Sequence, residues 1–265
     1  MLSPEFGKEL WNSKAAFWDS MHGQNGNDFH MDFVEPTVDR LLCLEKGERV
    51  LDLCCGSGIL SRHLVAMGAD VTAVDWSEGL LERARSRGGG VDYQCIDATD
   101  ENTLLGLGEG NFDAITSTMA LMDVSNIEPM FRAAKKLLKN GGRMIVVTMH
   151  PAFFSNSPCL GVERGEREGR QTYEHYIKLK KYLGMSPCLG VGSSTEPNPH
   201  IYYHRPLHAL LSPALDSGMM LDKLEELGYP QRKWNDGDPI PKDLYIARWT
   251  NLYEIPLVLA FRLRV

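Results

Sequence analysis

A turn that carries two glycines follows the first apolar strand that the sequence predicts. Residues 49–53 form this strand, and the five residues after it, 54–58, read CCGSG. Glycines at positions 56 and 58 would let the backbone turn tightly into the next helix and approach a ligand closely. A G-x-G turn does not identify the ligand, because the same spacing also begins dinucleotide-binding sites.

Two residues near this turn argue against a nicotinamide dinucleotide. The third position of the dinucleotide fingerprint holds Ser61 instead of glycine. Asp52, at the end of the strand, would repel a pyrophosphate and attract an ammonium group of a ligand. A nucleotide-binding oxidoreductase therefore stays open only as an alternative.

Acidic residues also end the next two predicted strands. Asp75 stands where a carboxylate can accept hydrogen bonds from both hydroxyls of a ribose, and Trp76 directly after it could stack on adenine. Asp97 could accept a hydrogen bond from the adenine amino group, with the N–H of Ala98 beside it. Ligands of open α/β sheets bind at the carboxyl ends of the strands, so the shared position of these residues favours an adenosine site over separate structural roles.

Short apolar strands alternate with longer helices through the middle of the chain. The strands are expected at residues 49–53, 70–75, 91–96, 112–117 and 143–148. The helices between them are expected at residues 59–67, 77–87 and 127–138. A further helix at 206–217 and strands at 219–227 and 255–263 would follow. This order predicts an α/β fold with a doubly wound, mostly parallel, seven-stranded sheet.

The remaining segments are expected to surround this core within a single domain, 1–265. Residues 1–46 would form an N-terminal helical cover over the core at 47–150, and residues 206–265 would complete the sheet. Residues 151–205 are rich in Pro, Gly and aromatic residues without regular periodicity, which predicts an inserted lid over the substrate. The segment contains two copies of SPCLGV, at 157–162 and 186–191.

Residues 48–150 resemble the class I S-adenosylmethionine-dependent methyltransferases. The glycine-rich first motif of that family matches residues 52–58, with Cys54 where a glycine is common, and its two later acidic residues match Asp75 and Asp97. The resemblance implies a Rossmann-like methyltransferase fold and S-adenosylmethionine as the cofactor. The residues that it implies for the cofactor are Asp52, Cys54, Gly56, Gly58, Asp75, Trp76, Asp97, Ala98, Thr116 and Met119.

The resemblance also implies an in-line transfer of the methyl group to N, O, C or S of an acceptor, for which the protein excludes water and removes a proton. The candidate catalytic residues are His150, Asp123 and His204, and His30 is a further candidate. A histidine at a strand end is more often a structural hydrogen-bonding residue than a base. The alternative is an enzyme that binds S-adenosylmethionine but catalyses a rearrangement without methylation.

Aromatic residues in the N-terminal cover and in the lid predict an apolar acceptor pocket between them. The candidate substrate-binding residues are Trp18, Phe29, His30, Phe153, Tyr173 and Tyr203. We expect a small, aromatic or partly hydrophobic metabolite, of secondary metabolism.

The composition excludes several other classes of protein. A net charge of −7 and a pI of about 5.6 argue against nucleic acid as a partner. No apolar run approaches the roughly 18–20 residues of a membrane helix, and no secretory signal is visible at the start. The six cysteines form no C-x-x-C pair, so neither a metal site nor disulfides are expected. We expect a cytoplasmic monomer or homodimer.

Overall fold

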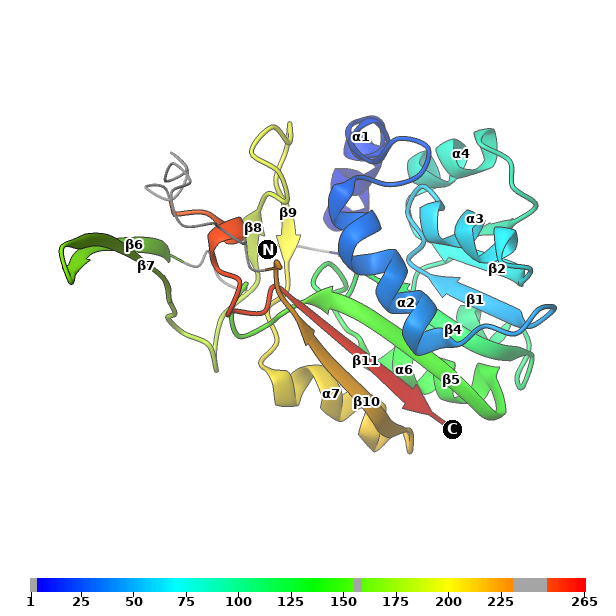
Figure 1. Ribbon diagram of the computed structural model, residues 1–265. Coiled ribbons are helices and arrows are strands. Elements are labelled where there is room, and N and C mark those ends of the chain that lie inside the picture. Colours follow the sequence, from blue (N-terminus) through cyan, green and yellow to red (C-terminus); the bar gives the residue numbers. More distant parts are fainter. Residues whose placement is uncertain (1–3, 155–158, 231–246) are drawn as a thin grey trace.

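The computed structural model describes residues 4–154, 159–230 and 247–265 and shows an α/β fold around one large sheet (Figure 1). The strands of this sheet are β1 (Arg49–Leu53), β2 (Asp70–Asp75), β3 (Asp92–Cys95), β4 (Phe112–Thr118), β5 (Leu138–Met149), β10 (Met220–Leu227) and β11 (Val258–Arg264). They lie in the order β10-β11-β5-β4-β1-β2-β3. The sheet therefore has seven strands, as predicted.

Strand direction follows the predicted doubly wound pattern. β1 pairs in parallel with both β2 and β4, and β2 with β3 and β4 with β5 are parallel as well. Only β11 breaks the pattern, since it runs antiparallel to β5 and to β10. The predicted fold class is confirmed, and the carboxyl ends of β1 to β4 lie at one edge.

Helices cover both faces of the sheet (Figure 1). They are α1 (Pro4–His22), α2 (Glu35–Leu42), α3 (Ile59–Ala66), α4 (Glu78–Ser86), α5 (Glu101–Leu105), α6 (Glu128–Leu137) and α7 (Leu207–Asp216). A π-helical turn, η1 (His30–Val34), leads into α2, and a 3-10 turn, η3 (Trp249–Asn251), precedes β11. The sequence did not predict α5, because five residues are too few to show a helical period.

The core consists of two apolar layers, one on each face of the sheet. Leu51 of β1 packs in the same layer as Phe131 of α6, and Val50 packs in the other layer with Leu42 of α2. β11 is buried along six of its seven residues and contributes to both layers. Burial on both faces explains why its sequence is a continuous apolar run instead of an alternating one.

The expectation of an irregular segment at 151–205 is wrong. β6 (Cys159–Arg167) and β7 (Arg170–Lys178) form an antiparallel hairpin that projects from the body of the molecule (Figure 1), and β8 (Cys188–Gly190) pairs with β9 (His200–Tyr202). Each SPCLGV copy enters a strand at its cysteine, although the first two residues of the copy at 157–162 lie outside the described residues. β6 and β7 are mostly exposed, so they lack the apolar alternation from which strands are predicted, and β8 and β9 have only three residues each.

The N-terminal helix α1 lies against α4 and β9. Asn12 Oδ1 accepts hydrogen bonds from Ser77 Oγ at 2.7 Å and from the Gly79 N–H at 3.2 Å. Ser77 itself caps α4 by accepting from the N–H of Leu80. An ion pair of 2.7 Å between Arg87 and Asp19 fixes the far end of α1. These contacts hold the predicted helical cover beside the carboxyl edge of the sheet.

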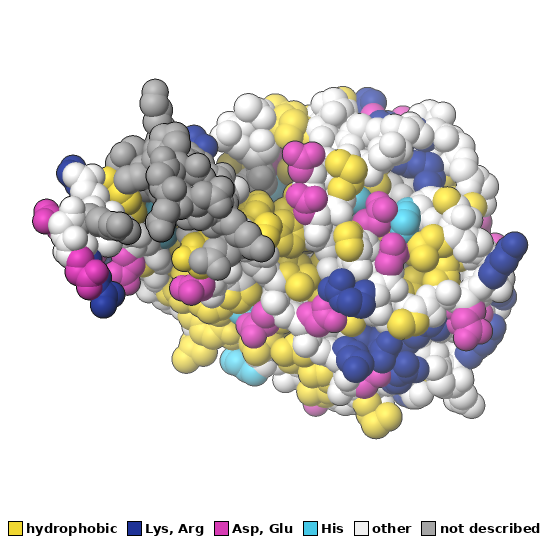
Figure 2. Space-filling view, in the orientation of Figure 1, with side chains coloured by type: hydrophobic (Ala, Val, Ile, Leu, Met, Phe, Trp, Pro, Cys, Tyr) yellow, Lys and Arg dark blue, Asp and Glu magenta, His cyan; other side chains and the backbone are white. Residues whose placement is uncertain are grey.

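Surface charges of both signs are interspersed on the face shown in Figure 2. Arg40 of α2 pairs with Glu225 of β10, and Arg262 of β11 pairs with Asp222 of β10 at 2.8 Å. The carboxylate of Asp222 also accepts from Arg264, and hydrogen bonds from the two guanidinium groups lower its pKa to about 2. These pairs connect the last two strands to each other and to α2.

Gly58 is the position where the turn after β1 depends most on glycine. Its φ is +73°, and an added Cβ would overlap the hydroxyl of Tyr93. We expect Gly58→Ala to lower the free energy of unfolding by about 2–4 kcal/mol, because it combines a left-handed alanine with a steric clash. The shift of the urea midpoint measures this loss. Gly218→Ala is the matched control, since Gly218 has φ +89° and open space around the added Cβ, and it should lose only about 1–2 kcal/mol. Equal losses would show that the contact with Tyr93 does not constrain the turn.

Candidate active site

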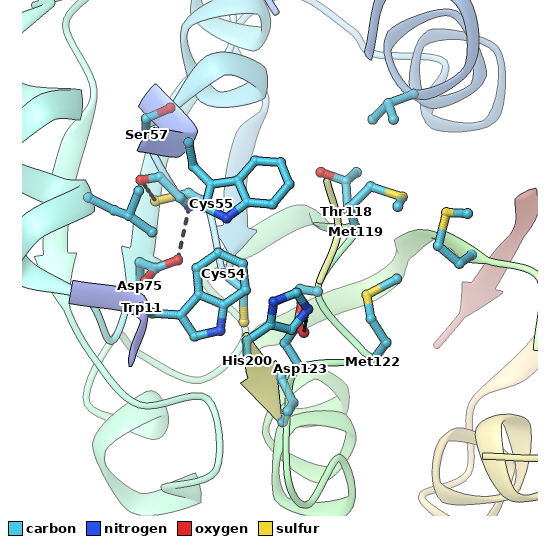
Figure 3. Close-up of a pocket in the computed structure, with 18 of the residues that line it drawn as sticks. Trp11, Cys54, Cys55, Ser57, Asp75, Thr118, Met119, Met122, Asp123 and His200 are labelled. Atoms are coloured by element: carbon cyan, nitrogen blue, oxygen red, sulfur yellow. Dashed lines mark hydrogen bonds and ion pairs between the residues drawn. The ribbon is translucent and has the colours of Figure 1, made fainter. Parts of the chain in front are cut away.

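A cavity of about 540 Å³ lies at the carboxyl edge of the sheet (Figure 3). Its wall combines the turn after β1, the ends of β2 and β4, the helix α1 and the strand β9. The volume is in the range of small-molecule sites. Among the described residues that line it there are three aspartates, Asp75, Asp97 and Asp123, and no Lys or Arg.

Asp75 joins the end of β2 to the glycine turn. Its Oδ2 accepts from the N–H of Gly56 at 2.9 Å, and its Oδ1 accepts from the N–H of Ser77 at 2.8 Å. Burial raises the pKa of Asp75 to about 6, against the effect of these backbone hydrogen bonds. Each carboxylate oxygen keeps a second lone pair, so the group can still accept from hydroxyls of a ligand. A Cβ added to Gly56 would meet nothing within 4 Å, which leaves room beside the carboxylate.

The next predicted contacts also line the cavity. Trp76, Asp97 and Ala98 lie on its wall together with Thr99. Asp97 Oδ1 accepts from both the N–H and the hydroxyl of Thr99, each at 2.8 Å, and this holds the loop after β3 in place. The structure thus brings together the residues predicted for an adenosine.

Asp52 does not face the cavity, in contrast to the prediction. It is buried, with Oδ2 accepting from Ser61 Oγ at 2.6 Å and Oδ1 accepting from Thr116 Oγ1 at 2.8 Å. Thr116 is buried as well and does not line the cavity. Gly58 also lies behind the wall, where it begins α3. The predicted cofactor contacts of Asp52, Thr116 and Gly58 are therefore corrected. Asp52 and Thr116 bond to protein groups in the core and Gly58 begins α3, so the three residues shape the turn instead.

Cys54 and Met119 line the cavity as predicted, and both have a left-handed backbone, with φ of 60° and 53°. The left-handed φ of Cys54 explains why a glycine is common at this position in the family that the sequence resembles. Burial and the nearby carboxylates raise the pKa of the thiols of Cys54 and Cys55 well above its usual value. Both thiols therefore stay protonated at neutral pH and form part of the wall.

The predicted acceptor residues divide into two groups. Trp18, Phe29 and His30 line the cavity. Burial lowers the pKa of His30 to about 4, so this imidazole is neutral. The other three predictions are corrected: Phe153 stacks on His150, Tyr173 bonds to Gln171 on the projecting hairpin, and Tyr203 lines a separate pocket of about 20 Å³.

Among the predicted catalytic residues, Asp123 and the further candidate His30 line the large cavity, whereas His150 and His204 do not. The Nε2 of His150 contacts Glu226 Oε1 at 2.8 Å, and the Nδ1 of the same ring accepts from the N–H of Ala152. His204 Nε2 donates to the carbonyl of Tyr182 at 2.6 Å. Both histidines line the small pocket, which has room for little more than a water molecule. The prediction of a base at these two positions is corrected, because both rings lie outside the large cavity. Both nitrogens of His150 contact protein atoms, and the buried Nδ1 of His204 has no hydrogen-bond partner among the described residues.

The sequence did not reveal several residues of the wall. His200 and Tyr202 come from β9, inside the segment that was expected to be irregular. Trp11 lies two turns before Trp18 on the same face of α1, and this spacing could have identified it. Arg205 does not line the cavity, but it was also missed: it donates to the carbonyls of Leu121, Val124 and Ser125 and so holds the loop that carries Asp123.

Comparison with known proteins identifies the family. The family described as "Methyltransferase domain" matches residues 51–146. The chain is 31% identical to 2-phytyl-1,4-naphtoquinone methyltransferase from Synechococcus elongatus, over 60% of this chain and 69% of that protein. It belongs to the class I S-adenosylmethionine-dependent methyltransferases.

Two further proteins agree with this membership of the methyltransferase family. A ubiquinone biosynthesis O-methyltransferase from Idiomarina loihiensis is 31% identical over 60% of this chain, which spans 66% of that relative's length. The crystal structure of an S-adenosylmethionine-dependent methyltransferase from Mesorhizobium loti superposes with a TM-score of 0.65 at 25% identity. It covers 89% of this chain and 100% of the other.

The residues of this methyltransferase fit S-adenosylmethionine. The ribose hydroxyls match the free lone pairs of Asp75, the adenine ring matches Trp76, and the open space at Gly56 admits a ligand close to the backbone. The adenine amino group matches the carboxylate of Asp97. When bound, S-adenosylmethionine supplies an electrophilic methyl group on a sulfonium cation, and the aspartates of the wall are compatible with that positive charge.

We expect Asp75→Asn to weaken binding of S-adenosylhomocysteine by more than about tenfold, because the ribose hydroxyls lose an ionised acceptor. Isothermal titration calorimetry measures the dissociation constant. Asp70→Asn is the matched control, since Asp70 lies at the opposite end of β2 and its side chain is 76% exposed. Unchanged affinity of Asp75→Asn would remove this residue from the cofactor site.

The raised pKa of Asp75 also predicts a pH dependence of adenosine binding. The carboxylate is ionised above about pH 6 and is protonated as the pH falls through that value. We therefore expect the affinity for 5′-methylthioadenosine, which has no amino-acid group that titrates, to fall below about pH 6 in the wild type. The same titration of Asp75→Asn should be flatter, and a parallel fall in both proteins would assign the effect to another group.

Proposed function

We propose that this methyltransferase transfers the methyl group of S-adenosylmethionine to a hydroxyl oxygen on the ring of a small, largely apolar aromatic metabolite. The observation that carries the proposal is the single cavity that joins the cofactor residues to an apolar, aromatic wall. Phe29, Phe154 and Tyr229 line the cavity, and so do the thioether side chains of Met119 and Met122. Flexible thioether side chains adapt to a flat ring, and aromatic side chains pack on it.

The charges of the wall favour a neutral acceptor. Its aspartates would repel a carboxylate or a phosphate, and the described wall offers no Lys or Arg to balance such a group. The names of two relatives, a ubiquinone biosynthesis O-methyltransferase and a naphtoquinone methyltransferase, support an acceptor of quinone type. Reduction turns the two carbonyl groups of a quinone into ring hydroxyls, and in that form the acceptor would be a hydroquinone or catechol. This replaces our expectation of an acceptor from secondary metabolism.

We also propose that the enzyme works in the cytoplasm as a monomer or homodimer. All six cysteines are free, which fits a reducing compartment. None of the helices in the described ranges has the length and apolar content that crossing a bilayer requires.

Incubation with S-adenosylmethionine and 4-tert-butylcatechol or an alkylated hydroquinone tests the acceptor class. We expect a monomethyl ether of the phenol and one equivalent of S-adenosylhomocysteine, detected by mass spectrometry. The matched anilines are the control, and the Asp75→Asn variant should reduce the yield at low cofactor concentration. Methylation of the anilines alone would contradict an oxygen acceptor. Conversion of an acceptor without gain of a methyl group would instead support the non-methylating alternative.

A further inference from the structure

Four ionisable side chains from separate parts of the chain meet at the cavity wall. Lys14 of α1 contacts Glu196, which precedes β9, at 2.6 Å between Nζ and Oε1. His200 of β9 lies between Glu196 and Asp123, with its Nδ1 at 3.2 Å from Glu196 Oε1 and its Nε2 at 3.3 Å from Asp123 Oδ1. The side chains of Lys14 and Glu196 are 0% exposed, that of His200 is 5% exposed, and that of Asp123 is 15% exposed. Figure 3 shows His200 and Asp123 next to each other at the wall.

Glu196 is the ionised member of this group. Besides Lys14, its carboxylate accepts from Trp18 Nε1 at 3.2 Å and from the N–H of Gly192 at 2.7 Å. Burial opposes ionisation, but the hydrogen bonds from Lys14 and Gly192 lower the pKa of Glu196 below its usual value. A carboxylate with this set of donors holds a negative charge inside the protein.

The charge on Glu196 fixes the tautomer of His200. An ionised carboxylate only accepts hydrogen bonds, so the proton of the neutral imidazole lies on Nδ1, which donates to Glu196. The lone pair is then on Nε2, the nitrogen that points to Asp123. A carboxylate orients the imidazole of a Ser-His-Asp triad in the same way.

Asp123 presents an unsatisfied acceptor beside this lone pair. Its Oδ1 is buried and makes no hydrogen bond within the described part of the chain, although His200 lies within ion-pair distance. Both side chains line the cavity. A buried acceptor without a donor is uncommon in a protein, and a hydroxyl of a ligand would satisfy it.

The surroundings of the pair leave its charge uncompensated. Lys14 and Glu196 cancel each other, Asp75 adds a negative charge elsewhere in the cavity, and burial raises the pKa of Tyr202, so its phenol is neutral. Burial also raises the pKa of Asp123 and, together with the charge of Lys14, lowers the pKa of His200. With a lone pair on Nε2 and no proton between it and Asp123, the pair therefore takes up a proton readily.

We propose that His200 is a catalytic base that removes the proton of the aryl hydroxyl of the acceptor. Asp123 is the second contact of this hydroxyl, and Glu196 and Lys14 are positioning residues that act through His200. The inference rests on the function proposed above. The O–H bond breaks, its electron pair stays on the oxygen, and the proton goes to Nε2 of His200 and is shared with Asp123. It passes to solvent when the product leaves.

The step favours acceptors with acidic hydroxyls. Proton transfer to an imidazole is much less unfavourable from a phenol than from an aliphatic alcohol, which is a much weaker acid. The oxygen that loses its proton is the atom that takes the methyl group from bound S-adenosylmethionine.

The first test observes the proton transfer without turnover. It uses 4-nitrocatechol, whose ionised form absorbs at longer wavelength, bound to the protein with S-adenosylhomocysteine at a pH below the pKa of the free probe. We expect the band of the ionised probe in the wild type and the band of the neutral probe in His200→Gln. His208→Gln is the matched control, because His208 is exposed on α7, and it should behave as the wild type.

The second test compares the rates with two acceptors. We expect His200→Gln to lower kcat for 4-tert-butylcatechol by about a hundredfold or more, which is the range of general base catalysis. The loss should be much smaller for 4-nitrocatechol above its pKa, because that acceptor is already ionised. Asp123→Asn should show the same pattern to a lesser degree.

A double variant that carries Lys14→Met and Glu196→Gln tests the positioning role of these two residues. Glu196→Gln alone would leave a buried ammonium group without a partner, so the double variant keeps the fold testable by its melting temperature. We expect a folded protein with an unchanged KM for 4-nitrocatechol, a lower kcat for 4-tert-butylcatechol, and a weaker band of the ionised probe. An unchanged band would overturn the role of Glu196.

The results distinguish a failure of the proposed base, His200, from a failure of the proposed function. If both acceptors are methylated and His200→Gln changes neither the band nor the rates, His200 is not the base but the oxygen methyltransferase stands. If the wild type binds S-adenosylhomocysteine but neither methylates nor binds any phenol, the proposed function fails and the base fails with it.

Discussion

Parallel pairing of β1 with β2 and β4 constrains the position of each polar group that the cavity uses. The register places the end of β1 beside the ends of both neighbours, so the glycine turn, Asp75 and the loop after β4 meet at one edge. The buried carboxylate of Asp52 reinforces this arrangement, because it binds Ser61 of α3 and Thr116 of β4 at once. A carboxylate in the core is expensive to bury unless its oxygens are satisfied, so it specifies how the turn, the helix and the next strand fit together. The groups at the rim can then stay available for a ligand.

A second constraint closes the cavity from the side opposite the sheet. The buried ion pair of Lys14 and Glu196 joins α1 to the segment before β9. Such a pair adds little net stability, because removing two charges from water offsets their attraction, but its geometry is strict. It joins the aromatic face of α1, with Trp11, to the segment that carries His200. The closing elements are therefore positioned by a polar contact, whereas the sheet is positioned by its apolar layers.

The sequence predicted those parts of the molecule in which local pattern and global fold agree. Alternating strands and helices predicted the sheet, and the positions of Asp75, Trp76, Asp97 and Ala98 followed from the carboxyl ends of its strands. The prediction for Asp52 was wrong because a residue at a strand end can point into the core as well as toward a ligand, and the sequence does not distinguish the two. His200 was missed for a different reason. It is brought to the site by contacts with Asp123, which is far from it in sequence, and with Glu196, which is four residues away in a segment that is not a helix.

The negative charge of the cavity affects both the binding of the methyl donor and the form in which the acceptor enters. A sulfonium cation is attracted by the aspartates of the wall, and the described wall offers no competing Lys or Arg. The same aspartates would disfavour an acceptor that arrives as an anion, because like charges repel strongly where water is excluded. A nucleophilic oxygen therefore enters more readily as a neutral hydroxyl and loses its proton inside the cavity, close to the cation. The proposed base at the wall follows from this charge pattern, since the environment that attracts the methyl donor disfavours a preformed phenolate.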